Sequence, residues 1–481
     1  MDKPVLSLLK SQCYVDGQWI GEPSVTVLNK ASGEEITKVP DFGGEETRAA
    51  IAAADRAFAP WSKLLAKERA NALRNWYNLI LEHADELAHL LTLEQGKPLA
   101  EAKGEIIYGA AFVEFFAEEA RRIYGEIIPT HKADARIVVV KQPVGVVGAI
   151  TPWNFPSAMI TRKVSPALAA GCTVVVKPAE DTPLSALALA ELAALAGIPK
   201  GVFNVVTCKN PVAVGEELTS NPLVRMITFT GSTAVGKILY RQSAATVKKL
   251  GLELGGNAPF VVFDDADLDK ALAGAMASKY RNAGQTCVCA NRIFVQEGVY
   301  DEFARRLAVE VAKLKVGDGM HEGVTQGPLI NDQAIAKVEE HVRDALAKGA
   351  KIALGGKRHE RGGNFFEPTI LTDVTSDMKV AHEETFGPVA PLFRFKDEDE
   401  VIRRANDVPA GLAAYFYTRD IGRAWRVGEA LDYGIIGINE GVISNEVAPF
   451  GGVKESGLGR EGSHHGIEEF VEMKYMLMGG V

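Results

Sequence analysis

The chain has 481 residues, of which 47% are hydrophobic and 24% are charged, a composition typical of a soluble globular enzyme. We expect two or three domains, because a single core rarely grows beyond about 250–300 residues. A net charge of −9 without a long basic block argues against nucleic acid as a partner. No apolar run reaches the roughly 18 residues of a membrane span, which argues against a membrane partner.

Cysteine usage and the start of the chain predict a cytoplasmic protein. The five cysteines are too few and too irregularly spaced for a disulfide framework or a cysteine-rich zinc site. Residues 1–10 are too short and too charged for a signal peptide. We predict no metal, because Lys270 replaces the glycine of a calcium loop in the run from Asp265, and because His464 and His465 are adjacent.

The opening quarter is predicted to be mainly helical after a short β-rich start at residues 13–20. Apolar residues recur at helical spacing in residues 45–61 and 67–93, and a third helix is expected through residues 105–124. The β-branched run at residues 137–141 predicts a strand.

From Gly145 onward, strands and helices alternate. We predict strands at residues 146–150, 172–177, 202–207, 226–230 and 248–253, with helices between them. A second α/β series follows from Pro259. This alternation predicts a parallel sheet with helices on both faces, and ligands of such sheets bind at the carboxyl ends of the strands.

Two of these strands end in polar residues that suit a site. Asn154 follows the first, between Pro152 and Pro156, where its amide can donate to a developing oxyanion. Lys177 and Glu180 follow the second, where a carboxylate can accept hydrogen bonds from a ribose 2′-hydroxyl and repel a 2′-phosphate. The alternatives are an Asx turn at Asn154 and ordinary surface charges at the other two.

Two later strands also lead into candidate site residues. The strand at 226–230 runs into G-S-T-A-V-G-K, which falls short of a P-loop because Ile238 lacks the hydroxyl that magnesium requires. Small residues at a helix N-terminus still favour a pyrophosphate. The next strand ends at Glu253, which can act as a general base for water or can be an ion-paired glutamate.

A possible nucleophile lies in R-N-A-G-Q-T-C-V-C, residues 281–289, between a predicted helix and a predicted strand. Cys287 is placed there beside glycine and small polar residues. A thiolate is the attacking species, so such a site must supply a base or lower the thiol pKa. The alternative is that Cys287 and Cys289 are inert buried residues.

Taken together, these segments resemble the aldehyde dehydrogenase family. The shared motifs occur in the family's order along essentially the whole chain: T-P-W-N-F-P, K-P-A-E, F-T-G-S-T-A-V-G, L-E-L-G-G-N, G-Q-T-C, E-E-T-F-G-P and P-F-G-G-V-K-E-S-G-L-G-R-E-G. Further stretches, including E-Q-G-K-P-L-A-E-A-K-G-E at 94–105 and N-E-G-V-I-S-N at 439–445, resemble the branch of the family that oxidises succinate semialdehyde.

The resemblance implies an α/β fold with three parts. Residues 1–121 and 142–252 would form a Rossmann-type parallel-sheet dinucleotide-binding domain, and residues 253–456 an α/β catalytic domain. Residues 122–141 and 457–481 would form a small β oligomerisation arm, which in the family builds a homotetramer from two dimers. The apolar runs at 137–140 and 475–478 are consistent with strand pairing at an edge.

The resemblance also implies roles for individual residues. Cys287 would attack the aldehyde, Asn154 and the backbone N–H of Cys287 would hold the oxyanion, and Glu253 would activate water to hydrolyse the thioester. The coenzyme would contact a set of residues from several strand ends: Trp153, Lys177, Glu180, Gly231, Ser232, Gly236, Glu384 and Phe386. We predict NAD over NADP, because Glu180 disfavours the 2′-phosphate.

The substrate of this branch carries a carboxylate at the end remote from its aldehyde. An arginine fork grips a carboxylate in two places, and Arg162, Arg281 and Ser444 match the branch at the positions that would do so. Glutarate semialdehyde is the alternative substrate, because one methylene is worth only about 1–3 kcal/mol in a pocket. Cys289, two residues from Cys287, could pair with it under oxidation and switch the enzyme off.

Two other functions fit the sequence less well than that of a hydrolysing aldehyde dehydrogenase. An acylating dehydrogenase that passes its thioester to coenzyme A must keep water off that thioester, which Glu253 argues against. A non-catalytic binding protein with the same fold would be expected to lack the nucleophile or the base, and Cys287, Glu253 and Asn154 are all present.

Overall fold

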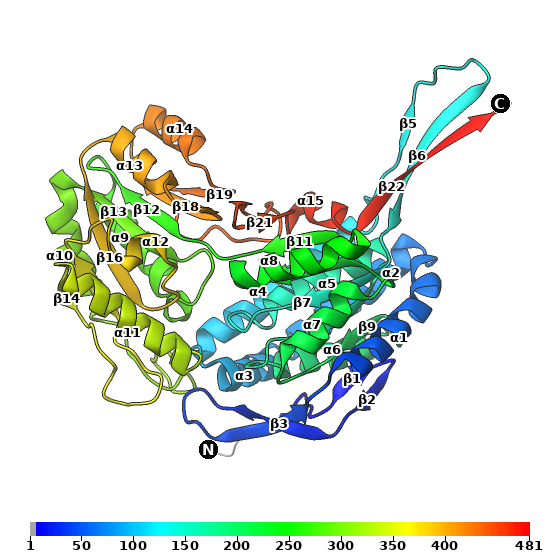
Figure 1. Ribbon diagram of the computed structural model, residues 1–481, viewed down its shortest axis with the longest axis horizontal. Coiled ribbons are helices and arrows are strands. Elements are labelled where there is room, and N and C mark those ends of the chain that lie inside the picture. The colour runs from blue at the N-terminus through cyan, green and yellow to red at the C-terminus, as the bar shows by residue number, and fades with distance from the viewer. Residues whose placement is uncertain (1–5) are drawn as a thin grey trace.

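The computed structural model describes residues 6–481 as two lobes and a projecting arm (Figure 1). The N-terminal half of the chain, blue to green, forms one lobe, and most of the later chain, green to orange, forms the other. None of the helices within residues 6–481 is long and apolar enough to cross a membrane.

The first lobe is built on an eight-stranded sheet in the order β2-β1-β9-β8-β7-β10-β11-β21. Its strands are β1 (Cys13–Val15), β2 (Gln18–Ile20), β7 (Val146–Ile150), β8 (Thr173–Lys177), β9 (Phe203–Val205), β10 (Val224–Thr230), β11 (Lys249–Glu253) and β21 (Gly457–Leu458). The five strands from β9 to β11 run parallel. The predicted parallel sheet is therefore confirmed.

Helices cover both faces of this sheet, and each face has its own apolar core. The helices are α1 (Gly44–Ser62), α2 (Ala66–Glu82), α3 (Ala84–Gln95), α4 (Leu99–Glu119), α5 (Ala158–Ala170), α6 (Leu184–Leu195), α7 (Pro211–Ser220) and α8 (Thr233–Ser243). Val174 packs with α2–α6, whereas the next residue, Val175, packs with α1, α7 and α8. Alternate side chains of a strand point to opposite faces, so every residue of β8 is buried and its three central residues are valines.

Two predicted helices of the N-terminal region were wrong in detail, and one hairpin was missed. The helix expected over residues 67–93 is two helices that meet at His83, where the acidic residues Asp85 and Glu86 begin a new first turn. The third helix begins earlier and ends earlier than expected, as α4 (Leu99–Glu119). The hairpin of β3 (Pro23–Leu28) and β4 (Glu35–Pro40) was not predicted.

The second lobe contains a seven-stranded sheet in the order β14-β15-β16-β13-β12-β18-β19. Its strands are β12 (Ala258–Val262), β13 (Ala290–Gln296), β14 (Lys351–Leu354), β15 (Thr369–Thr372), β16 (Val389–Phe395), β18 (Ala413–Tyr417) and β19 (Ile435–Ile438); β17 (Ala410–Gly411) and β20 (Val453–Lys454) form a separate pair. All but β14 run parallel. The helices are α9 (Leu268–Tyr280), α10 (Tyr300–Val311), α11 (Asp332–Ala347), α12 (Lys379–His382), α13 (Glu398–Asn406) and α14 (Ile421–Ala430).

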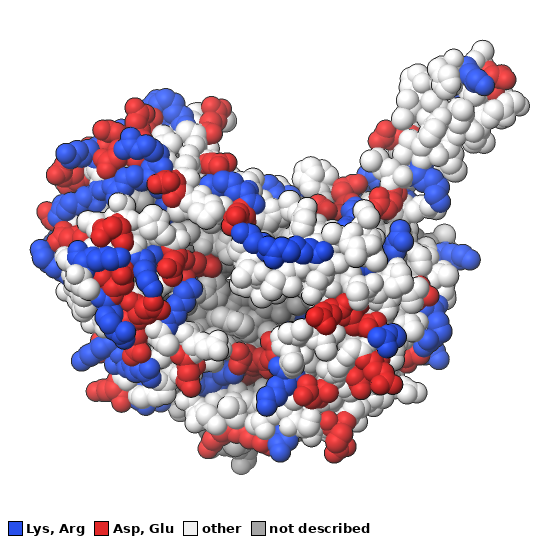
Figure 2. Space-filling view, in the orientation of Figure 1, with Lys and Arg blue, Asp and Glu red and all other residues white. Residues whose placement is uncertain are grey.

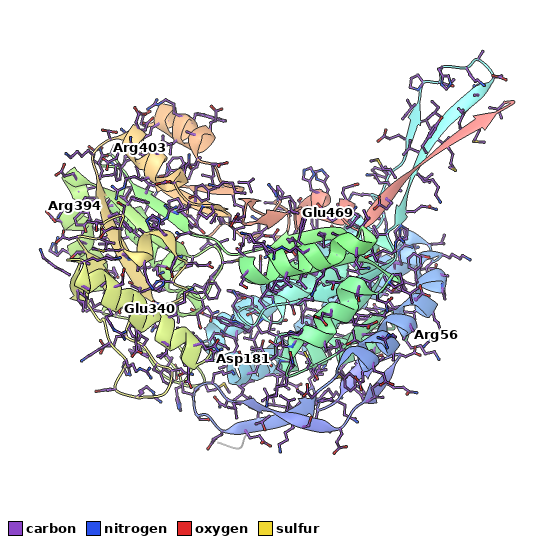
Figure 3. The ribbon with its side chains drawn as sticks, in the orientation of Figure 1. Arg56, Asp181, Glu340, Arg394, Arg403 and Glu469 are labelled. Carbon is purple, nitrogen blue, oxygen red and sulfur yellow. The ribbon has the colours of Figure 1, made fainter. Side chains whose placement is uncertain are left out.

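The arm is a three-stranded antiparallel sheet that leaves the first lobe, with Glu469 at its base (Figures 1 and 3). It consists of β5 (Glu126–Ile128), β6 (Ala135–Pro143) and β22 (Val471–Gly479). The arm expected from residues 457–481 therefore starts later in the structure. Gly457–Leu458 instead pairs with β11, and α15 (Ser463–Glu468) packs on α5.

Charged side chains of both signs are interspersed over the visible face of both lobes, which is hollowed between them (Figure 2). Asp181 lies where the lobes approach one another (Figure 3). It pairs with Lys30 at 2.6 Å and accepts a hydrogen bond from Asn331 of the second lobe at 3.2 Å. This contact ties the two lobes together beside the hollow.

Candidate active site

A cavity of about 410 Å³ lies between the lobes, at the carboxyl ends of the parallel strands of the first sheet. Among its lining residues are ten that sequence analysis selected: Trp153, Asn154, Arg162, Gly231, Ser232, Glu253, Cys287, Glu384, Phe386 and the flanking Pro152. The strand-end rule therefore located the cavity, because neighbouring parallel strands bring their carboxyl ends to one edge.

Cys287 follows a strained turn between α9 and β13. Asn282 and Ala283 have left-handed backbone conformations, with φ of 51° and 55°, which are unfavourable for residues with a Cβ. Gly284 continues this path at φ 75°, and a Cβ there would lie only 2.2 Å from the carbonyl oxygen of Gly387. Contacts with neighbouring segments therefore hold residues 282–284, just before Cys287, in a conformation that these residues would not favour on their own.

Asn154 reaches this loop from the other lobe. Its side chain is buried, and Nδ2 donates to the carbonyl oxygen of Gln285 at 3.2 Å. Its Oδ1 also accepts from the N–H of Phe155 at 3.1 Å. The amide is therefore held against the loop that carries Cys287.

Burial raises the pKa of the Cys287 thiol to about 12, although the positive charge of Arg162 opposes this effect. The thiol is accordingly protonated in the neutral range. Its reactivity must come from a base or from a change in its surroundings when ligands bind.

Glu253 lies at the end of β11 with one carboxyl oxygen that has no hydrogen-bond partner among the described residues. Burial, and next the negative charge of Glu461, raise its pKa well above the ordinary value. Glu461 itself pairs with Arg162 at 2.8 Å and with Lys163. Although burial would raise the pKa of Glu461, the Lys163 and Arg162 charges hold it below its usual value.

Several predicted coenzyme residues surround the N-terminus of α8, where Ser232 caps the helix by accepting from the N–H of Val235 at 3.4 Å. Gly236 lets this helix lie against Leu254, since a Cβ would approach Leu254 to 2.4 Å. An exposed helix N-terminus of this kind, beside a cavity, fits a pyrophosphate. The residues present therefore fit a dinucleotide.

The other coenzyme residues occupy two separate places. The rings of Trp153 and Phe386 meet edge to face at 5.4 Å, and Glu384 accepts from the N–H of Gly256 at 3.2 Å. Burial raises the pKa of Glu384 to about 7. Lys177 and Glu180 pair with one another at the end of β8 and do not line the cavity.

The three predicted substrate residues meet around Tyr108 of α4, which sequence analysis did not select. Arg162 donates to the Tyr108 hydroxyl at 3.3 Å, and its guanidinium lies 4.1 Å from the centre of the Phe450 ring. Burial raises the pKa of Tyr108, whereas Arg162, Arg281 and a hydrogen bond with Ser444 lower it. Arg281 lies 5.3 Å from the centre of the Phe155 ring.

Glu461 and Tyr108 are the residues that sequence reasoning missed. Glu461 was contained in the quoted tail motif, but an acidic residue between glycines resembles a solvent-exposed turn. Tyr108 lies three positions after Glu105 on α4, and only the tertiary structure brings it to Arg162.

Cys289 is buried, and its Sγ lies 3.5 Å from the carbonyl oxygen of Lys279. All five cysteines are present as free thiols. Within residues 6–481, no three or more acidic, histidine or cysteine side chains gather closely enough to hold a metal ion.

The structure is an α/β fold with a cavity between its two lobes, at the carboxyl ends of the parallel strands of the first sheet. A model described as "Aldehyde dehydrogenase family" matches residues 18–476. The chain therefore belongs to the aldehyde dehydrogenase family.

Individual relatives are similar over nearly their full length. The chain is 65% identical to the succinate-semialdehyde dehydrogenase [NADP(+)] GabD of Escherichia coli, over 98% of each chain. It is 62% identical to a glutarate-semialdehyde dehydrogenase of Pseudomonas aeruginosa, over 98% of this chain and 99% of the relative. The crystal structure of a succinate-semialdehyde dehydrogenase from Burkholderia pseudomallei superposes with a TM-score of 0.98 at 62% identity, covering 100% of this chain and 99% of that one.

Proposed function

We propose that the protein oxidises succinate semialdehyde to succinate with NAD, through a thiohemiacetal and then a thioester on Cys287. The observation that carries this proposal is the convergence of Cys287, Asn154 and Glu253 on one cavity whose wall includes the arginine Arg162. The similarity to relatives that are named for semialdehydes ending in a carboxylate supports it.

In the first step the sulfur of Cys287 adds to the aldehyde carbon as its thiol proton passes to a base, for which Glu253 in the same cavity is the candidate; Glu253 then releases this proton to solvent. The Asn154 amide and the Cys287 backbone N–H donate to the oxygen, which takes up negative charge as the carbon becomes tetrahedral. Removing one donor of this kind typically lowers kcat by about 10²–10³-fold.

A nicotinamide dinucleotide, when bound, supplies the acceptor for the hydride that leaves the tetrahedral carbon. The carbonyl that re-forms makes a thioester with Cys287. Glu253 then takes a proton from water as the water attacks this thioester, which releases the acid and the thiol. Its raised pKa makes Glu253 a stronger base once it is deprotonated, so hydrolysis is expected to become faster as pH rises through that pKa.

Arg281 is the strongest candidate for binding the substrate carboxylate. Arg162 already has Glu461 as its ion-pair partner, whereas Arg281 has no carboxylate within 4.0 Å among the described residues. The positive charge of Arg281 nevertheless acts on both Tyr108 and Cys287. A substrate carboxylate bound between Arg162, Arg281 and Ser444 would give Arg281 the negatively charged partner that the protein does not supply.

We expect Arg281→Ala to lower kcat/KM for succinate semialdehyde by about 10–100-fold, because hydrogen bonds to charged groups contribute about 1.5–3 kcal/mol. An uncharged aldehyde such as butanal should be affected much less. Steady-state kinetics on aldehydes of graded length, with and without a terminal carboxylate, measure this. Arg361→Ala is the matched control, since Arg361 also lies beside an aromatic ring, 5.4 Å from the centre of Phe365, but is not among the charges that act on Tyr108 or Cys287. An unchanged preference in Arg281→Ala would contradict the assignment, and a maximum at glutarate semialdehyde would favour the alternative substrate.

The proposed preference for NAD rests on Glu180, whose carboxylate pairs with Lys177 at the end of β8. We expect a higher kcat/KM with NAD than with NADP. Glu180→Ala should raise kcat/KM for NADP by about tenfold or more, because like charges at 4 Å repel by roughly 1–4 kcal/mol near a surface. Kinetics with both coenzymes measure this, and an NADP preference in the parent enzyme, as the name of the E. coli relative implies for that enzyme, would overturn it.

The proposed oxidative switch pairs Cys287 with Cys289. Cys289→Ser should make inactivation by peroxide much less reversible by thiols, because Cys287 would lose the partner that protects it from further oxidation. Recovery of activity after dithiothreitol treatment measures the effect. If Cys289→Ser stays as peroxide-sensitive and as thiol-rescuable as the parent, the switch is ruled out.

We infer a tetramer built from two dimers through the arm. The arm carries exposed apolar side chains that an isolated subunit would leave in water: Ile127, Met473, Tyr475 and Met478 are 82%, 72%, 57% and 50% exposed. Met473→Lys together with Met478→Lys should therefore yield smaller species in sedimentation velocity. Leu65→Lys, at a residue 70% exposed outside the arm, is the control. A parent that sediments as a monomer would contradict this inference.

A further inference from the structure

The end of α3, the short connection after it and the first turns of α4 contact both the loop that carries Asn154 and the loop that carries Cys287. This stretch is E-Q-G-K-P-L-A-E-A-K-G-E, residues 94–105, and the proposed chemistry assigns it no role. Glu101, Glu105 and Tyr108 follow at helical spacing on α4, so they share one face of that helix. Tyr108 contacts Arg162, and the two glutamates contact the loops that carry Asn154 and Cys287.

Lys97 and Glu105 form a buried ion pair on this segment. Lys97 Nζ and Glu105 Oε2 are 2.6 Å apart, and their side chains are 1% and 0% exposed. Burial lowers the pKa of Lys97, and the carboxylate of Glu105 opposes that effect. Such a pair adds little to the stability of the fold compared with apolar residues of the same volume. We therefore ask which neighbouring groups the pair holds in place.

Both members of the pair hold the turn that carries Asn154. Lys97 Nζ donates to the carbonyl oxygen of Asn154 at 2.8 Å and lies 3.8 Å from the centre of the Phe155 ring. Glu105 Oε1 accepts from the N–H groups of Ser157 and Ala158, at 2.9 and 3.2 Å, where α5 begins. The turn from Asn154 to the start of α5 is therefore held at both of its ends by one ion pair.

The same helix also holds the nucleophile loop. Glu101 accepts from the N–H of Asn282 at 2.8 Å, in the left-handed part of the turn before Cys287. Asn282 Nδ2 in turn donates to the carbonyl oxygen of Asn154 at 3.0 Å, the atom that also accepts from Lys97. The two loops that would supply the oxyanion donors are thus fixed to α4 and to each other.

We propose that Lys97 and Glu105 are positioning residues that set the distance between the Asn154 amide and the Cys287 backbone N–H. This inference rests on the proposed function, because it assumes that these two groups hold the oxyanion. Neither Lys97 nor Glu105 lines the cavity, so the pair acts on the reaction only through the Asn154 turn.

The test uses the double variant Lys97→Met/Glu105→Gln, which leaves neither charge buried alone. Kinetics are measured with propanal, so that the result does not depend on the proposed carboxylate site. We expect kcat to fall by about 10–100-fold with a nearly unchanged KM, because small displacements of a catalytic donor cost about 10²-fold. Should the double variant not fold, Lys97→Leu/Glu105→Gln replaces it with the same expected loss of kcat, since it also leaves no charge buried alone.

Glu94→Gln is the matched control from the same segment. Glu94 is equally buried and accepts from the N–H groups of Leu184 and Ser185, at 2.6 and 2.8 Å, at the start of α6, but it has no contact with Asn154 or Cys287. We expect this variant to keep its kcat with propanal. The rate of iodoacetamide alkylation at Cys287, which needs no oxyanion donor, should be similar in all variants.

A double-mutant cycle with Asn154→Ala separates positioning from general destabilisation. If the ion pair acts through Asn154, its removal should lower kcat less than about twofold once Asn154 is alanine. Additive losses, an unchanged kcat in the double variant, or an equal loss in Glu94→Gln would each overturn the inference while leaving the proposed function intact. An unchanged kcat in Asn154→Ala alone would instead overturn the oxyanion assignment, and the positioning role with it.

Discussion

The burial of a few ionisable side chains around the cavity determines most of the chemistry of this protein. Burial raises the pKa of the Cys287 thiol, of the Glu253 carboxyl and of the Glu384 carboxyl together. In water all three would have ordinary values, and neither nucleophile nor base would differ from a surface residue. Burial thus favours the neutral form of all three groups.

Burial also dictates which charges can be present. Arg162 and Lys163 are nearly inaccessible and share the carboxylate of Glu461, and Lys97 shares that of Glu105. Each of these cations would be costly without its partner, because an unpaired buried charge is far less stable than a paired one. The paired carboxylates therefore allow positive charge to remain close to Cys287 and Asn154.

The sequence predicted the sheet and the strand ends well, because both depend on local patterns. Val146–Ile150 is apolar at every position, and the glycines and prolines that follow such strands mark where side chains become free for a site. Partnerships between distant segments could not be predicted. Lys163 and Glu461 are 298 positions apart, and nothing near Glu461 distinguishes it from a surface glutamate. The split at His83 was also missed, since apolar periodicity continues across it.

The arm has a consequence for how the chain folds. Its middle strand, β6, is completed by β22, and Lys141 of β6 pairs with Glu468, 327 positions later. During synthesis β5 is available to β6 at once, but the other edge of β6 stays unpaired until β22 has been made, because contacts of such sequence separation form late. The three-stranded arm is therefore finished only after the strands of both lobes have been synthesised.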